Sequence, residues 1–192
     1  AWQLSISADG RFIAFVQPVD IGSRLAPAYV DQVLVADATQ PGRLDPASFS
    51  PQTGRPGSGA SGNPALSPNG RYLTFRSDAP DLVPNDQNGL PDIFVRDLQA
   101  GVTWLASARP DGSSGNERAL GSPQISADAS TVIFLGAASD LIAGDYNNQA
   151  DIFAFSVPVV PSPDTDQDGL ADAWEMAQFT DLSHDGSADS DL

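Results

Sequence analysis

The sequence contains no cysteine and no lysine, and only two of its 25 acidic residues, Glu117 and Glu175, are glutamate. The absence of cysteine excludes disulfide bonds, thiolate metal sites and cysteine nucleophiles. Glutamate and lysine are common residues of solvent-exposed helices, so their scarcity argues against a helical protein. Aspartate, the acid that is present instead, suits turns, caps and the oxygen-rich sites that bind hard cations.

Positive charge is also scarce in this chain. Its 192 residues include nine basic side chains, all of them arginine, and carry a formal net charge of -16. Residues 164–192 hold nine acids and no base. A surface that binds nucleic acid needs the opposite sign, so nucleic acid is excluded as an expected partner. Long apolar runs are missing, so no membrane span is predicted, but 41% hydrophobic residues suffice for a globular core.

Two motifs recur three times along the chain in the same register. The first is SADGRFIAF at 7–15, which returns as SPNGRYLTF at 67–75 and, degraded, as SADASTVIF at 126–134. The second is VLVAD at 33–37, which returns as IFVRD at 93–97 and as IFAFS at 152–156. The copies lie 60 and 59 residues apart, which indicates one structural unit repeated three times.

Each unit is predicted to consist of β-strands. Asp-Gly at 9–10 and Asn-Gly at 69–70 are typical of two-residue hairpin turns, because these residues tolerate positive φ. Ala129 replaces the glycine in the third copy, which predicts a looser turn or one of another type. Apolar residues at both odd and even positions of 71–75 indicate a strand that is covered on both faces. Residues 101–107 supply a fourth strand for the second unit. Four antiparallel strands in about 60 residues match one propeller blade.

These motifs resemble the TolB-type, WD-repeat-like β-propeller repeat over residues 5–157. The segment DLVPNDQNGLPDIFVRD at 81–97 carries the same resemblance. It implies an all-β fold of three four-stranded antiparallel propeller-type blades, at about 1–60, 61–119 and 120–157. This version of the repeat is common in large exported bacterial proteins, which implies an extracellular or cell-surface location.

Three blades make an incomplete propeller, because closed propellers normally take 4–8 blades. The third repeat ends at 157–161 with no visible fourth strand. Open blades leave sheet edges and an apolar face without a partner. We therefore expect either further blades of a longer polypeptide, which is the interpretation we favour, or the assembly of copies into a six-bladed ring or a filament.

A proline-rich linker at 158–163 precedes an acidic loop at 164–175, which has the calcium-binding pattern Asp-x-Asp-x-Asp-Gly and a terminal Glu. Ca²⁺ takes six to eight oxygen ligands, and Gly169 permits the sharp turn that lets the carboxylates converge. A solvated acidic tail is the alternative. The predicted ligands, which include the backbone carbonyl of Leu170, are Asp164, Asp166, Asp168, Leu170, Asp172 and Glu175.

Residues 164–192 resemble dockerin or thrombospondin type-3 calcium repeats, because a linker precedes the loop where an EF-hand would have a helix. A short helix is predicted over 171–179. Asp189 and Asp191 begin a second loop, but the chain ends before its remaining ligands. We therefore predict a calcium loop-helix module with one complete site and a truncated second loop.

A second kind of acidic loop, Asp-x-Asn-x-x-x-Asp, precedes the third strand of repeats two and three. Its oxygens at positions 1, 3 and 7 fit a Ca²⁺ site that carbonyls or water would complete. Asx-turns that fix the strand entrance are an equally good interpretation. Gln32 aligns with the last Asp in repeat one, so no such site is expected there. The candidate ligands are Asp86, Asn88 and Asp92 in repeat two, and Asp145, Asn147 and Asp151 in repeat three.

No catalytic motif is recognisable in the sequence. The single histidine, His184, lies in the acidic tail, and nucleophile-elbow, zinc-helix and phosphate-loop patterns are missing. The leading hypothesis is a non-enzymatic, calcium-binding propeller segment of an exported bacterial protein that serves adhesion or binds a protein or carbohydrate. The alternatives are a self-assembling structural subunit, in a ring or filament, and an accessory propeller domain of a secreted hydrolase.

Overall fold

The structure is a computed structural model that describes residues 3–22, 26, 28–147 and 149–158. Spatial contacts divide the chain into two units, Ala1–Val157 and Pro158–Leu192. All the strands of the described residues belong to the first unit. The predicted calcium loop, the helix over 171–179 and the truncated second loop lie outside the described residues.

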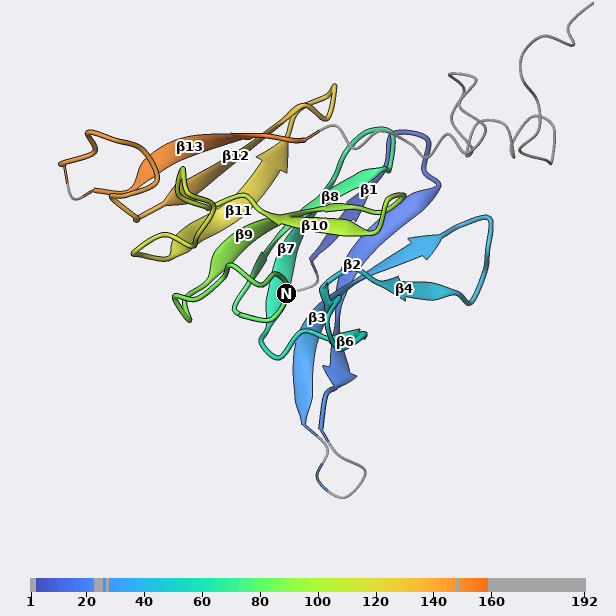
Figure 1. Cartoon of the computed structure of the whole chain (residues 1–192). Helices are drawn as coiled ribbons and strands as arrows, with labels where there is room; N and C mark the ends of the chain where they lie inside the picture. Colours follow the sequence, from blue (N-terminus) through green and yellow to red (C-terminus); the bar gives the residue numbers. More distant parts are fainter. Residues whose placement is uncertain (1–2, 23–25, 27, 148, 159–192) are drawn as a thin grey trace, which may run out of the picture. The chain divides into compact units, whose positions relative to one another are not determined.

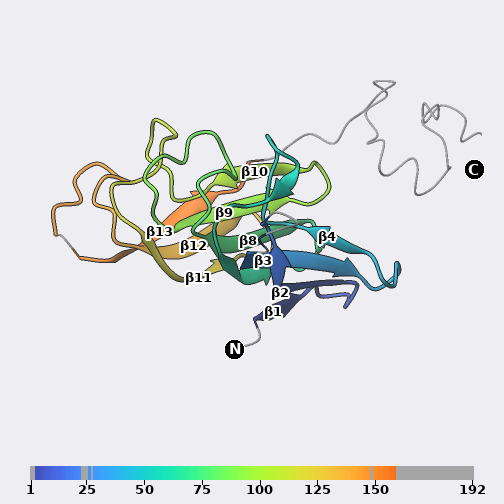
Figure 2. The same cartoon turned by 90° about the horizontal axis from the view of Figure 1, so that it is seen from below.

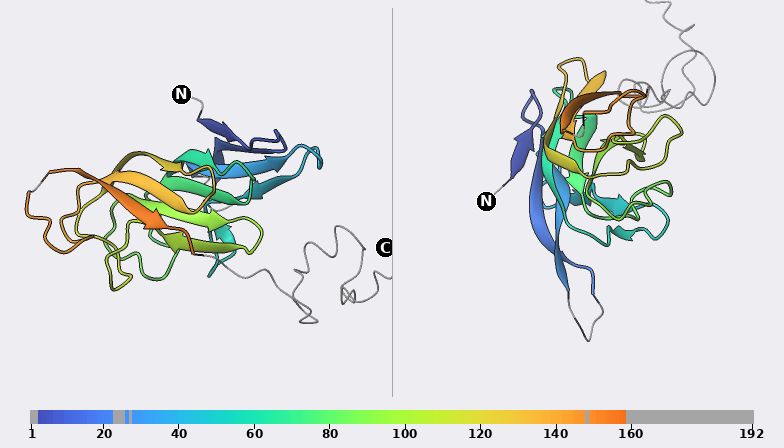
Figure 3. Two further views of the ribbon diagram at one scale, coloured as in Figure 1. Left: turned by 90° about the horizontal axis from the view of Figure 1, so that it is seen from above. Right: turned by 90° about the vertical axis from the view of Figure 1, so that its left-hand side faces the viewer.

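The first sheet, blade 1, is a four-stranded antiparallel meander in which neighbouring strands are consecutive in the sequence. Its strands are β1 (Leu4–Ile6), β2 (Phe12–Asp20), β3 (Tyr29–Asp37) and β4 (Leu44–Pro46). Ala14 lies opposite Val35 in the register of β2 and β3, and both side chains are buried. The β2–β3 hairpin extends beyond the rest of the sheet, as the right-hand view of Figure 3 shows.

Blades 2 and 3 repeat the same meander. Blade 2 contains β7 (Ser61–Leu66), β8 (Tyr72–Ser77), β9 (Asp92–Asp97) and β10 (Val102–Leu105). Blade 3 contains β11 (Ala119–Ile125), β12 (Thr131–Gly136) and β13 (Asp151–Ser156). The connection between blades 1 and 2 also forms a short hairpin, which the repeat does not predict, from β5 (Phe49–Ser50) and β6 (Arg55–Pro56).

The predicted all-β fold with propeller-type blades is confirmed. Blades 1 and 2 have the four predicted strands, whereas the described part of blade 3 has three. The described residues form no helix, and so contain no helical segment that could span a bilayer. The blades follow one another in chain order, from blue through green to orange in Figure 1, and Figure 2 shows the same order from below.

The turns between the first two strands of a blade differ from the predicted two-residue hairpins. In blade 1 only Gly10 has a positive φ, 73°, whereas a type I′ turn needs two such residues. The side chain of Ser7 closes the connection: its Oγ accepts the N–H of Phe12 at 2.9 Å and donates to the Asp9 carboxylate at 2.5 Å. Ser67 makes the equivalent bonds in blade 2. The Asp-Gly pair therefore belongs to a longer, serine-closed connection.

The prediction of a different turn at Ala129 is wrong. Its φ of 60° is close to the 71° of Gly70, and its N–H donates to the carbonyl of Ser126 as the Gly70 N–H donates to Ser67. The hydroxyl of Ser126 also donates to Asp128, as in the other copies. These bonds hold the alanine in a left-handed conformation that costs an L-residue roughly 1 kcal/mol.

Two apolar cores join the blades, one at each junction. The first core includes Val33, Val35, Leu66, Leu73, Phe75 and Phe94, and the second includes Ile93, Val95, Val132, Phe134 and Phe153. The ring centroids of Phe75 and Phe94 lie 5.8 Å apart, and those of Phe134 and Phe153 lie 5.7 Å apart at the equivalent place. Blade 2 contributes to both cores, so its sheet is covered on both faces.

We predict that Gly70→Ala destabilises the protein more than Gly10→Ala, although the two glycines have nearly the same φ. A Cβ at Gly10 meets nothing within 4 Å, whereas one at Gly70 would overlap Cδ2 of Phe12 in blade 1. Both variants bear the left-handed backbone cost of about 1 kcal/mol. Only Gly70→Ala adds overpacking, at about 1 kcal/mol or more.

Urea unfolding of the two variants measures this difference in the free energy of unfolding. Gly10→Ala is the matched control, because it changes the same backbone conformation in open space. Equal losses in the two variants would contradict the packing of Phe12 against the blade 2 turn.

Candidate cation site in the loop before β9

The loop between β8 and β9 folds around the side chain of Asn88. Its Oδ1 accepts the N–H of Leu90 at 2.7 Å, which closes an Asx-turn, and its Nδ2 donates to Oδ2 of Asp92 at 2.9 Å. Oδ1 of Asp92 accepts the hydroxyl hydrogen of Ser107 at 2.5 Å. The predicted ligands Asn88 and Asp92 are therefore brought together, and hydrogen bonds fix both at the entrance to β9.

The segment that leads from blade 2 to blade 3 closes over this loop. Oγ of Ser114 accepts the N–H of Asn88 at 3.1 Å, and the carbonyl of Gly115 accepts Nδ2 of Asn88 at 3.0 Å. Beneath this segment, Asp92 is fully buried and Asp86 is only 5% exposed. The three predicted ligands therefore lie in a loop that is closed to bulk solvent on this side.

Asp86 is the member of the loop whose hydrogen bonding is incomplete. Its Oδ1 is buried and has no hydrogen-bond partner among the described residues. Burial and the nearby charge of Asp92 raise the pKa of Asp86 to about 6, and burial also raises the pKa of Asp92. A backbone hydrogen bond from Asn88 lowers this pKa, but by less than burial raises it. An ionised carboxylate that is buried beside a second acid is costly. Asp86 is therefore stabilised by binding either a proton or a cation.

Blade 1 shows which part of this arrangement the fold itself requires. Gln32 stands at the position of Asp92 in the repeat. Its Oε1 accepts the hydroxyl hydrogen of Ser48 at 2.7 Å, and its Nε2 donates to the carbonyl of Gly57 at 3.1 Å. These two bonds reproduce the serine bond of Asp92 and the glycine bond of Asn88. One neutral amide therefore replaces the pair, and the strand entrance is formed without charge.

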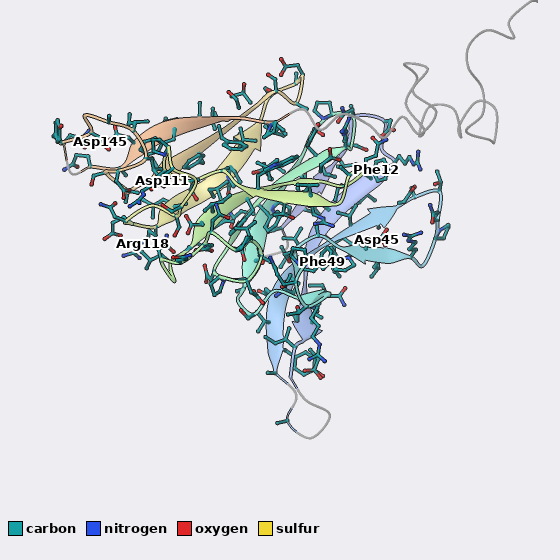
Figure 4. All side chains as sticks on the ribbon, viewed as in Figure 1. Phe12, Asp45, Phe49, Asp111, Arg118 and Asp145 are labelled. Carbon is teal, nitrogen blue, oxygen red and sulfur yellow. The ribbon has the colours of Figure 1, made fainter. Side chains whose placement is uncertain are left out.

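The equivalent loop of blade 3 has the same internal bonds but is more open to solvent. Nδ2 of Asn147 donates to Oδ2 of Asp151 at 2.9 Å, and Oδ1 of Asn147 accepts the N–H of Gln149 at 2.7 Å. Asp145 and Asp151 are half-buried and Asn147 is exposed. Figure 4 places Asp145 at the tip of blade 3. A cation in this loop would keep much of its hydration, so this is the weaker of the two candidate sites in the blades.

Each of these two loops brings only two carboxylates together, and the described residues contain no group of three or more acidic, histidine or cysteine side chains that could hold a metal ion. In the blade 2 loop, Ca²⁺ would take oxygens from Asp86 and Asp92 and complete its shell of six to eight with carbonyls or water. The more strongly patterned site at 164–175 lies outside the described residues, and its ligands stay a prediction.

Sequence reasoning missed a groove between blades 1 and 2. It has a volume of about 380 Å³, and its lining includes Phe12, Asp45, Phe49 and Arg96. The guanidinium of Arg96 lies 4.5 Å from the ring centroid of Phe49, and burial lowers the pKa of Arg96. Figure 4 shows Phe12, Asp45 and Phe49 at the blade 1 end of the unit. Phe49 belongs to the β5–β6 hairpin. The equivalent connection after blade 2 forms a single bridge between Ala108 and Ser114, with an alanine at the position of Phe49, so periodicity does not predict this groove.

Comparison with known proteins finds similar solved structures, whereas no protein-family model and no curated protein matches the chain. TolB from Acinetobacter baumannii is 17% identical, with a TM-score of 0.43 over 82% of this chain and 33% of its own. A protein described as TolB from Agrobacterium tumefaciens is 14% identical, with a TM-score of 0.45 over 82% and 58%. An acylaminoacyl peptidase from Pyrococcus horikoshii is 12% identical, with a TM-score of 0.42 over 71% and 17%.

The chain thus spans less than two thirds of the length of each of these proteins. The set contains TolB proteins and a peptidase, so it assigns no activity to this chain. TM-scores below 0.5 carry no argument, and the fold assignment rests on the repeated sheets themselves. Those sheets define the chain as a β-propeller-type repeat protein.

We predict that the metal-free protein loses stability as the pH rises through about 6, and that Asp86→Asn removes most of this loss. The folded state raises the pKa of Asp86 from 3.8 to about 6. Between these values the folded state binds more protons than the unfolded state. The contribution of this group is therefore greatest below the unfolded pKa and declines as Asp86 ionises, by up to about 3 kcal/mol.

Urea unfolding of both proteins in a chelator, between about pH 4 and 8, gives the difference between their stability curves. Groups such as Asp37, whose pKa is lowered mainly by its hydrogen bond from Arg11, contribute equally to both curves and cancel. Parallel curves would contradict the raised pKa of Asp86.

Proposed function

We propose that this chain is a calcium-binding, non-enzymatic β-propeller segment of an exported bacterial protein, and that it serves adhesion or binds a protein or carbohydrate. One observation carries the calcium part of this proposal. The buried Oδ1 of Asp86 has no hydrogen-bond partner in the part of the chain that the structure describes, and it lies near a second buried carboxylate, Asp92. A divalent cation between these two acids would replace their repulsion with attraction.

The choice of Ca²⁺ follows from the donor atoms. The loop offers carboxylate, amide and backbone carbonyl oxygens and no nitrogen or sulfur ligand, which suits a hard cation. Ca²⁺ accepts irregular shells of six to eight oxygens, whereas Mg²⁺ demands a near-ideal octahedron. An irregular loop that is already partly closed by hydrogen bonds favours the more tolerant ion.

The C-terminal pattern supports the same chemistry from a separate part of the chain. Residues 164–175 provide five carboxylates and a glycine at the spacing of a calcium loop. More carboxylate ligands give tighter binding, so we assign the higher affinity to this loop and the lower affinity to the blade 2 loop. Sites of modest affinity fill at extracellular calcium concentrations, which supports the proposed export.

Burial of the two blade 2 acids supports a structural role for the ion over catalysis. A general acid or base must come within hydrogen-bond distance of its substrate. Asp86 and Asp92 lie beneath the segment that carries Ser114, where a substrate does not reach them. The alternative of an accessory domain of a secreted hydrolase would place the catalytic residues elsewhere in a longer polypeptide.

The groove between blades 1 and 2 supports a binding role. It combines the ring of Phe49 with the guanidinium of Arg96 and the carboxylate of Asp45. Aromatic rings beside charged hydrogen-bonding groups are a common composition of protein and carbohydrate binding surfaces. We therefore place the ligand-binding surface here and the ion in the loop before β9.

Calorimetric titration of the metal-free chain with Ca²⁺ tests the proposed function. We expect heat of binding and a rise in the melting temperature, because an ion that binds only the folded state stabilises it. At a free concentration of 100 times Kd, each site adds about 2.7 kcal/mol to the free energy of unfolding.

Three variants distinguish the sites. Asp86→Asn removes the buried carboxylate of the blade 2 loop, and Asp168→Asn removes a predicted ligand of the C-terminal loop. Asp31→Asn, at an exposed aspartate outside both loops, is the matched control. We expect Asp86→Asn and Asp168→Asn each to lower the number of bound ions by one, and Asp31→Asn to leave it unchanged.

If Asp86→Asn binds as many ions as the wild-type chain, the blade 2 site is wrong and any calcium belongs elsewhere. If the wild-type chain gives neither heat of binding nor a shift in melting temperature, the calcium function as a whole is wrong.

A further inference from the structure

Both internal junctions of the unit are built from the same two kinds of face. We call the face of a blade that points toward the preceding blade its near face, and the opposite face its far face. At each junction the far face of the earlier blade packs against the near face of the next blade. At the first junction these faces carry Val33 and Leu66, and at the second they carry Ile93 and Ile125. Val33 and Ile93 are fully buried, and Leu66 is buried as well.

The far face of blade 3 has the same apolar character, but no described residue packs against it as a further blade would. Ile152 occupies the position of Val33 and Ile93, and it is 75% exposed. Its cross-strand partner Leu135 and the neighbouring Ile133 are exposed too. We call Ile133, Leu135 and Ile152 the blade 3 end face.

The near face of blade 1 is the opposite half of such a junction. Ile6 occupies the position of Leu66 and is 55% exposed, and Leu4 is 67% exposed. Ile13 and Phe15 on β2 are the cross-strand partners of Ile6 and Leu4, and both are only half-buried. We call Leu4, Ile6, Ile13 and Phe15 the blade 1 end face.

We propose that the blade 3 end face of one chain packs against the blade 1 end face of a second copy, head to tail. The repeat supplies the reason for this occupant, because a far face against a near face is the junction that the chain already forms twice. A second copy offers the required face with the same strand spacing. The equivalent positions also hold side chains of the same type, with Val33, Ile93 and Ile152 on far faces and Ile6, Leu66 and Ile125 on near faces.

The geometry allows either closure or extension. Two copies supply six blades, which falls within the range of closed propellers, whereas a junction that does not close gives a filament. The contact is heterologous in both cases, because it joins two different faces. The proposal does not depend on calcium, and the cation site proposed in blade 2 uses neither end face.

The dependence of association on salt distinguishes an apolar junction from one made by ion pairs. Each chain has a formal net charge of -16, so two copies repel each other at low ionic strength. Added salt screens this repulsion but leaves the apolar contact in place. We therefore expect association to strengthen with salt, whereas a contact made by ion pairs would weaken.

Light scattering of the full chain across the micromolar range is the first measurement. We expect a mass above that of one chain, which increases with concentration and with salt. Ile6→Asp and Ile152→Asp each place a charge on one end face, and each is expected to weaken self-association by at least about 10-fold. Tyr29→Asp is the control, because Tyr29 is 70% exposed on the β2–β3 hairpin, outside both faces.

A mixture of the two variants tests the head-to-tail arrangement. Every junction uses one face of each kind, so neither variant can form a complete junction with itself. In the mixture, the intact blade 3 end face of the Ile6→Asp chain meets the intact blade 1 end face of the Ile152→Asp chain. We therefore expect the mixture to form a complex of two chains, while each variant alone has the mass of one chain.

Three results would overturn the proposal. A wild-type chain that stays monomeric at high salt would show that the end faces are covered by something other than a second copy. Self-association that survives either variant would show that its face is not used. Variants that keep the wild-type circular dichroism spectrum and yet form no complex when mixed would exclude a head-to-tail junction.

Discussion

Burial of both faces of each β-sheet is the constraint on which the rest of this structure depends. Fully burying a valine, leucine, isoleucine or phenylalanine side chain contributes about 1.5–3 kcal/mol. Blade 2 satisfies this constraint on both sides, since Phe75 is buried in one core and Ile93 in the other. Blades 1 and 3 satisfy it on one side each. Ile6 and Ile152 are exposed for this reason. The residues at their equivalent positions in blade 2, Leu66 and Ile93, are buried in the cores.

The repeat predicted the sheets because its motifs contain the strand pattern and the turn residues together. VLVAD and IFVRD fall on β3 and β9, and residues 71–75, with apolar residues at both odd and even positions, fall mostly on β8. The turns were less predictable, because glycine is only one of their determinants. At Ala129 the bonds of Ser126 and Asp128 impose a left-handed conformation on a residue with a Cβ. A prediction based on glycine alone ignores these side-chain hydrogen bonds, and it therefore failed at Ala129.

The candidate site was predictable in its residues but not in its surroundings. Spacing identifies Asp86, Asn88 and Asp92, whereas the segment that covers them carries Ser114 and belongs to the connection into the next blade. This contact joins residues that are distant in sequence, so no local pattern contains it. The same spacing recurs in blade 3, where Asp145 is only half-buried. Two loops with the same Asp-x-Asn-x-x-x-Asp spacing therefore lie in different environments, and only the covered loop of blade 2 buries its first aspartate.

The comparison of blades 1 and 2 separates what the fold requires from what chemistry requires. Gln32 makes, with one neutral amide, the bonds that Asn88 and Asp92 make as a pair. A neutral arrangement is therefore compatible with the same strand entrance. Burying a charge costs several kcal/mol even after relaxation, and Asp86 lies near Asp92 with no hydrogen bond from any described residue to its Oδ1. The fold can therefore form this strand entrance without two acids, and this contrast supports the proposed cation site in blade 2, for which a bound proton is the alternative.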